Sequence, residues 1–208
     1  MAKIEELLAA NPKVKVVAMV FHETSTGMIN PVKEVGALCK KYNKWYHVDS
    51  VSAAAGERID VVENNITFTT SVGGKCVCAK ESHQTPNTPN VTLFWALNQA
   101  LKNIHSEGLD SQIARYKKCA AMLCNGMKDL GLKLLLPEEH MSNTVTSVFL
   151  PEGKDLDAFI KAMESRGYVV YPGKGKYMKM GMFQVANMGE IYEDDCREFL
   201  KVLKDCLK

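Results

Sequence analysis

The order of three segments near the start of the chain constrains the fold most strongly. An apolar, strand-forming run occupies residues 14–21, a helical pattern begins at Pro31, and a second strand-forming run occupies residues 45–49. The helical pattern has apolar residues three and four positions apart, at Val32, Val35, Leu38 and Cys39. A strand–helix–strand order predicts parallel strands joined by a right-handed crossover. Because residues 14–21 are almost all apolar, we expect that strand to be buried on both faces.

The rest of the chain divides into further strand and helix patterns. We expect helices over 3–10, 93–104, 108–130, 156–166 and 194–207, and strands over 66–71, 132–136, 144–150, 168–171 and 182–186. Gly131 is placed to end the helix over 108–130. This order predicts an α/β domain over residues 1–130, followed by a smaller α+β domain over residues 131–208.

Composition excludes several classes of protein. The 208 residues are 46% hydrophobic and 24% charged, as in globular proteins, which excludes disordered and low-complexity chains. A net charge of +2 gives no reason to expect nucleic acid or an acidic membrane surface as a partner. The longest apolar run, residues 16–21, is too short to cross a bilayer. Seven cysteines without framework spacing, and no signal-peptide core, predict a cytoplasmic protein with reduced thiols.

Three polar side chains follow the first three expected strands. Thr24 comes after the first, Asp49 after the second and Lys75 after the third. Ligands of open parallel sheets bind beyond the carboxyl ends of the strands, where these residues would lie. Gly73 and Gly74 would let the backbone approach a ligand closely, and a lysine beside cationic groups can become a nucleophile. The plainer alternatives are a loop-capping Asp49 and an ordinary surface Lys75.

Other ligand motifs fit the chain poorly. A P-loop would need Gly in place of Thr69 and Ser or Thr in place of Cys76. No G-x-G-x-x-G motif follows the first strand, which argues against a nicotinamide site. Two cysteines separated by one residue, at positions 76 and 78, do not have zinc-site spacing, and we expect no metal site. A general phosphate-binding domain, resting on Lys75 and on the Lys174-Gly175-Lys176 turn, remains an alternative.

A series of segments resembles the class V aminotransferases of fold type I. The segments are HETSTGMINPVKEVGALCKKY, VDSVSAAAG, SVGGKC, TPNTPNV, SNTVTSVFLPEGKDL, RGYVVYPGK and FQVANMGEI, in the order of the family. Within the family they are most similar to the enzymes that transfer the amino group of 2-aminoethylphosphonate to pyruvate. The resemblance implies a large domain with a parallel or mixed sheet, a smaller α+β domain, and pyridoxal 5′-phosphate (PLP) as cofactor. It also implies a small amine and a keto acid as substrates.

The resemblance assigns roles to five residues of this chain. Lys75 matches the catalytic lysine, which bonds covalently to PLP and moves a proton during the reaction. Asp49 matches the carboxylate that pairs with the pyridinium nitrogen and keeps it protonated. Thr24 matches a hydroxyl that contacts the ring substituents, and Val51 an apolar residue against the ring, although Val51 also fits as an ordinary strand-end valine. Thr88 matches a threonine that reaches the cofactor phosphate from the neighbouring subunit, which implies a homodimer.

Three departures from the family pattern affect the expected function. The family's N-terminal segment, with its phosphate-binding loop and ring-stacking aromatic residue, precedes the part matched here. Only residues 77–84 separate the lysine motif from TPNTPN, where the family has a long stretch. Gln184 stands where the family has an arginine that binds the substrate carboxylate. A neutral amide replaces a charged bidentate donor there, so we expect weaker carboxylate binding.

Two explanations account for the missing segments. Either the sequence omits parts of a longer protein, with a break near Cys78 and Ala79, or the protein itself is shorter than its family. Two functions follow from the resemblance. The first is a PLP-dependent transaminase with Gln184 at its substrate site. The second is a catalytically impaired relative that acts as a binding or interaction protein.

Overall fold

The structure is a computed structural model that describes residues 1–71 and 91–208. The chain forms two compact units, which we call unit 1 (Met1–His22 and Asn30–Gln112) and unit 2 (Glu23–Ile29 and Ile113–Lys208). Lys75, Thr88 and the expected break near Cys78 lie outside the described residues. The domain division at residue 130 stays a prediction, and the two units divide the chain elsewhere.

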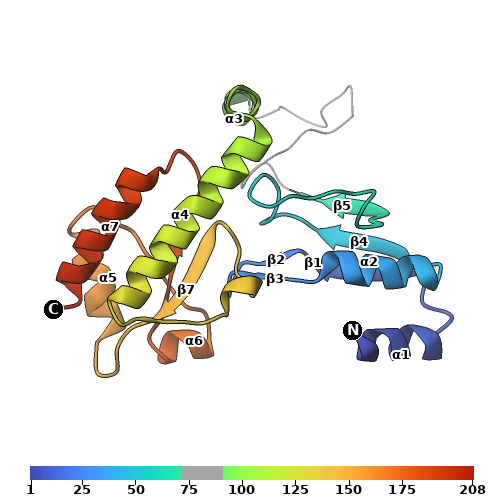
Figure 1. Ribbon diagram of the computed structural model, residues 1–208, viewed down its shortest axis with the longest axis horizontal. Helices are drawn as coiled ribbons and strands as arrows, with labels where there is room; N and C mark the ends of the chain where they lie inside the picture. Colours follow the sequence, from blue (N-terminus) through green and yellow to red (C-terminus); the bar gives the residue numbers. More distant parts are fainter. Residues whose placement is uncertain (72–90) are drawn as a thin grey trace. The chain divides into compact units, whose positions relative to one another are not determined.

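Unit 1 contains a three-stranded parallel sheet. Its strands are β1 (Val16–Val20), β4 (Trp45–Asp49) and β5 (Phe68–Thr70), in the order β1-β4-β5 (Figure 1). Its helices are α1 (Ala2–Ala10), α2 (Val32–Lys41) and α3 (Val91–Glu107). The helix α2 connects β1 to β4, so the predicted strand–helix–strand order and parallel pairing are confirmed.

The helix α2 packs closely on one face of the sheet. Tyr46 and Val48 of β4 have no exposed surface. Val35 and Cys39 of α2 are also buried, with at most 1% of their surface exposed. Gly36 makes this approach possible, because a Cβ at this position would lie 1.9 Å from the carbonyl oxygen of Asn64. A side chain larger than hydrogen at position 36 would therefore push the helix away from the 60–66 turn.

The opposite face of the sheet is exposed, which corrects the prediction that the first strand is buried on both faces. The exposed fractions are 41% for Val16, 38% for Val20, 62% for Trp45 and 44% for Phe68. In the parallel register Val16 pairs with Trp45 and Val20 with Asp49, so these side chains share one face. The apolar run indicated the strand correctly, but one face of β1 is uncovered in the part of the chain that the structure describes.

Unit 2 contains a four-stranded antiparallel sheet in the order β6-β7-β9-β8. The strands are β6 (Lys133–Leu134), β7 (Val145–Phe149), β8 (Tyr171–Pro172) and β9 (Met182–Ala186). The helices are α4 (Leu109–Asp129), which enters unit 2 at Ile113, α5 (Leu156–Glu164), α6 (Lys176–Lys179) and α7 (Glu193–Cys206), with a 3-10 turn over Glu138–His140. Two two-residue strands, β2 (His22–Glu23) and β3 (Met28–Ile29), flank the loop that follows β1. The expected α/β part and α+β part are thus both present, but within the described residues the α+β unit is not the smaller of the two.

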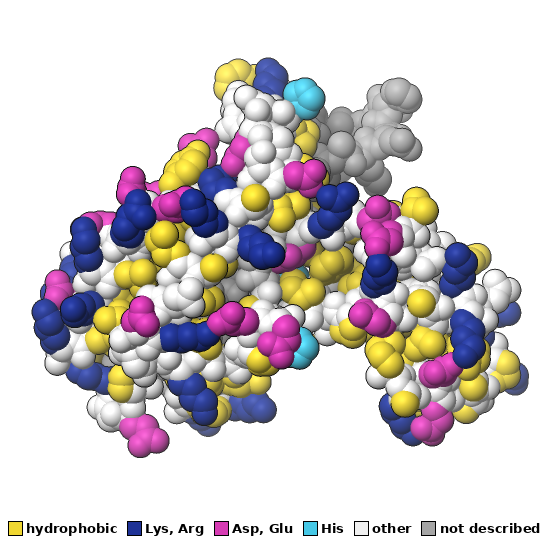
Figure 2. Space-filling view, in the orientation of Figure 1, with side chains coloured by type: hydrophobic (Ala, Val, Ile, Leu, Met, Phe, Trp, Pro, Cys, Tyr) yellow, Lys and Arg dark blue, Asp and Glu magenta, His cyan; other side chains and the backbone are white. Residues whose placement is uncertain are grey.

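The core of unit 2 lies between its sheet and the helices α4, α5 and α7 (Figure 1). Its most deeply buried side chains include Cys119, Leu123, Met127, Val148, Phe159, Met163, Phe183 and Leu203. The rings of Phe159 and Phe183 lie 4.8 Å apart between centroids, in a tilted contact typical of aromatic pairs in cores. On the side drawn in Figure 2, basic and acidic side chains alternate over the outer surfaces of the helices.

Two elements of unit 2 differ from the expectation. The strand expected over residues 168–171 pairs only at Tyr171–Pro172, next to β9. Val170 is 3% exposed because it packs into the core, so its apolar character reflects burial without sheet pairing. Pro172 has no amide hydrogen, which confines it to an edge strand. The short helix α6 was not predicted.

No helix within residues 1–71 and 91–208 is long and apolar enough to cross a membrane.

Candidate cofactor and substrate site

Asp49 is the last residue of the middle strand of unit 1. It pairs with Val20 of β1 and with Thr70 of β5. Its side chain is half-buried, and Oδ1 accepts a hydrogen bond of 2.9 Å from the backbone N–H of Val51. This bond is an Asx-type turn, which holds the carboxylate at the carboxyl end of the strand. The structure thus brings together two predicted site residues, Asp49 and Val51.

Neighbouring strands fix the backbone around Asp49. The N–H of Phe21 donates to the carbonyl of Asp49 over 2.8 Å, and the N–H of Ser50 donates to the carbonyl of Thr70 over 2.8 Å. The hydroxyl groups of Ser50 and Thr69 lie 2.8 Å apart. The carboxylate is therefore carried by backbone that is bonded on both sides, which limits how far it can move.

A buried histidine supports the turn that follows Asp49. His22 is 2% exposed, and its Nδ1 lies 2.9 Å from the carbonyl oxygen of Ser52. The sequence gives no local signal for this contact, because the two residues are 30 positions apart. His22 therefore joins the end of β1 to the turn at the end of β4.

Thr24 and Gln184, the other two predicted site residues that the structure describes, lie together in unit 2. Nε2 of Gln184 donates to the carbonyl oxygen of Thr24 over 3.1 Å and to Oγ of Ser147 over 2.9 Å. Ser147 stands directly opposite Gln184 in the β7–β9 pairing. A primary amide has two N–H donors, so both donors of Gln184 are used within the protein.

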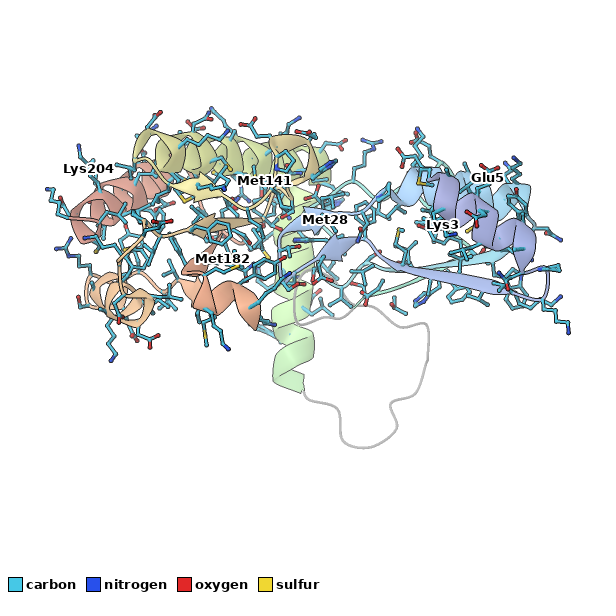
Figure 3. The ribbon with its side chains drawn as sticks, turned by 90° about the horizontal axis from the view of Figure 1, so that it is seen from below. Lys3, Glu5, Met28, Met141, Met182 and Lys204 are labelled. Carbon is cyan, nitrogen blue, oxygen red and sulfur yellow. The ribbon has the colours of Figure 1, made fainter. Side chains whose placement is uncertain are left out.

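The loop that carries Thr24 is bound to the start of β7. The carbonyl of Gly27 accepts a hydrogen bond of 2.8 Å from the N–H of Ser142. Gly27 has a φ of +79°, and a Cβ there would lie 2.6 Å from the carbonyl oxygen of Val145. Met28 forms an antiparallel bridge with Met141, and Figure 3 shows these two residues close together. Thr24 is therefore held in unit 2 by backbone contacts on the residues that follow it.

The Asp49 carboxylate is suited to bind the protonated nitrogen of a pyridinium ring. One carboxylate oxygen is held by the backbone of Val51, and the other has no hydrogen bond to any residue within 1–71 and 91–208. An oxygen in this state can accept the N–H of a protonated ring nitrogen. Of the residues that the resemblance assigns, the structure thus places Asp49 with Val51 and Thr24 with Gln184.

Comparison with known proteins identifies the relatives of the chain. Residues 1–81 match the family model "Aminotransferase class-V". The 2-aminoethylphosphonate–pyruvate transaminase of Salmonella paratyphi C is 29% identical over an alignment that covers 98% of this chain and 66% of the relative. The Klebsiella pneumoniae protein of the same name is 28% identical, with 99% and 66% covered. An uncharacterized aminotransferase of Methanocaldococcus jannaschii is 28% identical, with 99% and 63% covered. The chain spans just under two thirds of the length of these relatives.

Solved structures of aminotransferases share the fold. Alanine–glyoxylate aminotransferase from Nostoc sp. has a TM-score of 0.86 at 23% identity, with 99% of this chain and 65% of that chain covered. Pyridoxamine–pyruvate aminotransferase from Mesorhizobium loti has a TM-score of 0.88 at 22% identity, with 99% and 63% covered. The fold is therefore that of the PLP-dependent aminotransferases. Within that class the chain is similar to the class V aminotransferases, and the resemblance expected from its motifs is confirmed.

The alignment also bears on the length of the chain between its motifs. It runs over 244 positions, 36 more than the 208 residues present, so at least 36 positions of the Salmonella paratyphi C protein have no counterpart here. The motif spacing predicts that the relatives have an additional stretch between Lys75 and Thr88. The place of the unmatched positions in the chain stays a prediction.

Proposed function

We propose that this chain is part of a PLP-dependent transaminase. It would move the amino group of a small amine, of the 2-aminoethylphosphonate type, to a keto acid such as pyruvate. The observation that carries the proposal is the Asp49 carboxylate, held at the carboxyl end of the middle parallel strand with one oxygen not bonded to any residue within 1–71 and 91–208. The names of the curated relatives and the match to the class V family model support it.

Each residue of the proposed site has a distinct task. When bound, PLP supplies a ring that withdraws electrons from the carbon carrying the amino group. Asp49 would hold a proton on the ring nitrogen, because an anionic carboxylate stabilises the protonated form. Nζ of Lys75 would attach the cofactor and then move the proton that changes position during amino transfer. Thr24, Val51 and Thr88 would hold the ring and its phosphate.

The hydrogen bonds of Gln184 support an amino donor without an α-carboxylate. Both N–H groups of its amide are used by Thr24 and Ser147, so neither is left for a substrate carboxylate. The remaining Oε1 is an acceptor and would not attract an anion. An amine such as 2-aminoethylphosphonate has no α-carboxylate to bind, and its anionic phosphonate would be bound by groups other than Gln184. Recognition of the keto acid carboxylate would fall to another group.

We also propose that the enzyme is a cytoplasmic homodimer. The match of Thr88 to a threonine that acts in the neighbouring subunit's site supports the dimer. Trp95 of α3 is 75% exposed, and a large exposed aromatic side chain is typical of an interface. Sedimentation equilibrium of the full chain tests the dimer, and a monomer at micromolar concentration would contradict it.

A visible absorption spectrum with added PLP tests the cofactor site. We expect an imine band, which borohydride should fix onto the peptide that contains Lys75. Lys75→Ala should abolish the band, whereas Lys80→Ala, its matched control five residues later, should leave it unchanged. Asp49→Asn should weaken PLP binding and shift the band, because the neutral amide no longer favours a protonated ring nitrogen. Labelling spread over several surface lysines would overturn the proposal.

A second candidate function is a PLP-binding relative without transaminase activity. The internal hydrogen bonds of Gln184 favour it, since they replace the substrate contact of the family's arginine. This candidate predicts a trapped Lys75 peptide but no amino transfer from any donor. Formation of alanine from pyruvate and 2-aminoethylphosphonate would reject it in favour of the transaminase.

A further inference from the structure

We propose that Gln184 is a positioning residue for the cofactor site and that it acts through Thr24. Its amide would hold the backbone of Thr24 at the place from which the Thr24 side chain contacts PLP. The inference rests on the proposed function, because the role of Thr24 comes from the motif resemblance. It gives Gln184 a task different from that of the substrate-binding arginine with which the resemblance matches it.

The sheet of unit 2 fixes the base of the Gln184 side chain. The neighbouring residues Phe183 and Val185 are 0% and 6% exposed and belong to the core. Successive side chains of a strand point to opposite faces, so Gln184 leaves β9 on the face away from the core. Ser147 of β7 stands directly opposite Gln184 in the antiparallel register and is 2% exposed. A side chain carried by a paired strand is held more precisely than one carried by a loop.

The bond to Thr24 determines which way the amide of Gln184 faces. Nε2 donates to the carbonyl oxygen of Thr24 over 3.1 Å and to Oγ of Ser147 over 2.9 Å. A hydroxyl group can donate or accept, so Ser147 would tolerate either end of the amide. A carbonyl oxygen only accepts, so Thr24 requires an N–H at this position.

The loop that carries Thr24 is attached to unit 2 on both sides of its turn. The N–H of Gly27 donates to the carbonyl of Glu23 over 2.8 Å, which closes the turn. The N–H of Ser142 donates to the carbonyl of Gly27 over 2.8 Å and attaches the second half of the loop. The bond from Gln184 attaches the first half, at Thr24 itself.

Loss of the bond from Gln184 should therefore displace Thr24 while the second half of the loop stays in place. A hydroxyl hydrogen bond to a ligand oxygen needs a distance of about 2.5–3.0 Å, so a small displacement of Thr24 is enough to weaken it. We expect the affinity for PLP to fall about three- to tenfold, the usual effect of one hydrogen bond.

Gln184→Glu and Ser147→Ala separate the two hydrogen bonds. Glutamate has the same length, but its carboxylate only accepts, so it opposes the Thr24 carbonyl and can still accept from the Ser147 hydroxyl. Ser147→Ala removes the other bond and keeps the N–H for Thr24. Titration of the visible PLP band should show about three- to tenfold weaker binding for Gln184→Glu and a change below about twofold for Ser147→Ala. Equal losses in the two variants would overturn the proposal.

Thr24→Val separates positioning from the charge that glutamate introduces. The variant removes the Thr24 hydroxyl and keeps the backbone carbonyl that Gln184 holds. In this background Gln184→Glu should change PLP affinity by less than about twofold, because the contact that it disturbs is already absent. A direct effect of the new negative charge on PLP would persist in both backgrounds, and that result would also overturn the proposal.

NMR spectra of the full chain without PLP distinguish this inference from the proposed function. The methyl and carbonyl carbon signals of Thr24 should shift in Gln184→Glu and should stay unchanged in Ser147→Ala. If the unchanged protein binds PLP but Gln184→Glu leaves the Thr24 signals in place, the inference alone is rejected. If the unchanged protein binds no PLP, the proposed function is rejected and the inference with it.

Discussion

The amide nitrogen of Gln184 donates a hydrogen bond of 3.1 Å to the backbone carbonyl of Thr24, 160 residues earlier in the chain. A second donor of the same group reaches Oγ of Ser147 on the neighbouring strand. Gln184 thus links β9, β7 and the loop after β1 into one part of unit 2. Gln184, which the motif resemblance predicts to stand at the position of a substrate-binding arginine, therefore has a structural role in this chain.

Replacing Gln184 by Met should destabilise unit 2 by about 1–3 kcal/mol. The change keeps the length of the side chain but removes both hydrogen bonds, and it leaves Ser147, which is 2% exposed, without its partner. Urea unfolding followed by far-UV circular dichroism measures the loss. Tryptophan fluorescence would not report on unit 2, because both tryptophans, Trp45 and Trp95, lie in unit 1.

Gln99→Met serves as the control for this change. Gln99 is exposed on α3, and its one side-chain hydrogen bond among the described residues is to Asn103 one turn later, so we expect a change below about 0.5 kcal/mol. Equal stabilities of the two variants would show that the contacts of Gln184 contribute nothing.

Gly27→Ala should be more destabilising than an alanine at a glycine that has open space around it. Gly27 and Gly153 both have positive φ, at +79° and +83°, so both substitutions cost about 1–2 kcal/mol of backbone strain. Gly27→Ala must also displace the carbonyl of Val145, only 2.6 Å from the new Cβ, which adds roughly 1–3 kcal/mol. Thermal and urea unfolding of the two variants measures the difference, and equal losses would contradict the close approach.

Asp155→Ala should cost about 1 kcal/mol of stability. Asp155 is the N-cap of α5, and its Oδ1 accepts a hydrogen bond of 2.7 Å from the N–H of Ala158. Asp157→Ala, two residues later in the first turn of the same helix, removes an acidic side chain but no cap. If the urea midpoints of the two variants fall by the same amount, charge near the helix start matters and the cap does not.

The stability of unit 2 should fall at alkaline pH through Cys196. Burial and the adjacent thiol of Cys119 raise the pKa of Cys196 from 9.0 to about 12. The unfolded chain therefore loses this proton near pH 9, whereas the native state retains it. The contribution of Cys196 to the free energy of unfolding is complete below pH 9 and is lost as the pH rises toward 12.

Urea unfolding at pH 7 and pH 10 tests this expectation. Cys196→Ala should lower stability at pH 7 but should lose less on going to pH 10 than the unchanged protein. Cys206→Ala, ten residues later and only half-buried, should keep the full pH dependence. If all three proteins lose the same unfolding free energy between pH 7 and pH 10, the pH dependence comes from groups other than Cys196.

Local sequence patterns predicted most helices and strands, because the spacing of apolar residues along the chain follows which side chains face the core. The spacing of Val32, Val35 and Cys39 predicts α2, and these three residues are its buried apolar ones. The strands β4 and β9 begin and end at the predicted residues, Trp45–Asp49 and Met182–Ala186.

What the sequence did not predict depends on distant parts of the chain. The exposure of Val16 and Val20 depends on what covers the sheet, which their own apolar character does not reveal. The partners of Gln184 and of His22 lie 160 and 30 residues away, beyond any local pattern. The functional assignments of the candidate site residues rest on motif resemblance and stay predictions: Lys75, Asp49, Thr24, Val51, Thr88 and Gln184.

The placement of residues 23–29 in unit 2 has a consequence for how the protein is made. A ribosome releases these seven residues long before it has synthesised Met141, Ser142 and Gln184, which bind them. Unit 2 therefore cannot complete its fold until Gln184 has left the ribosome, and until then residues 23–29 lack these partners. For the same reason a fragment that starts at Ile113 would lack a stretch of its own unit. No single cut in the gene separates the two units intact.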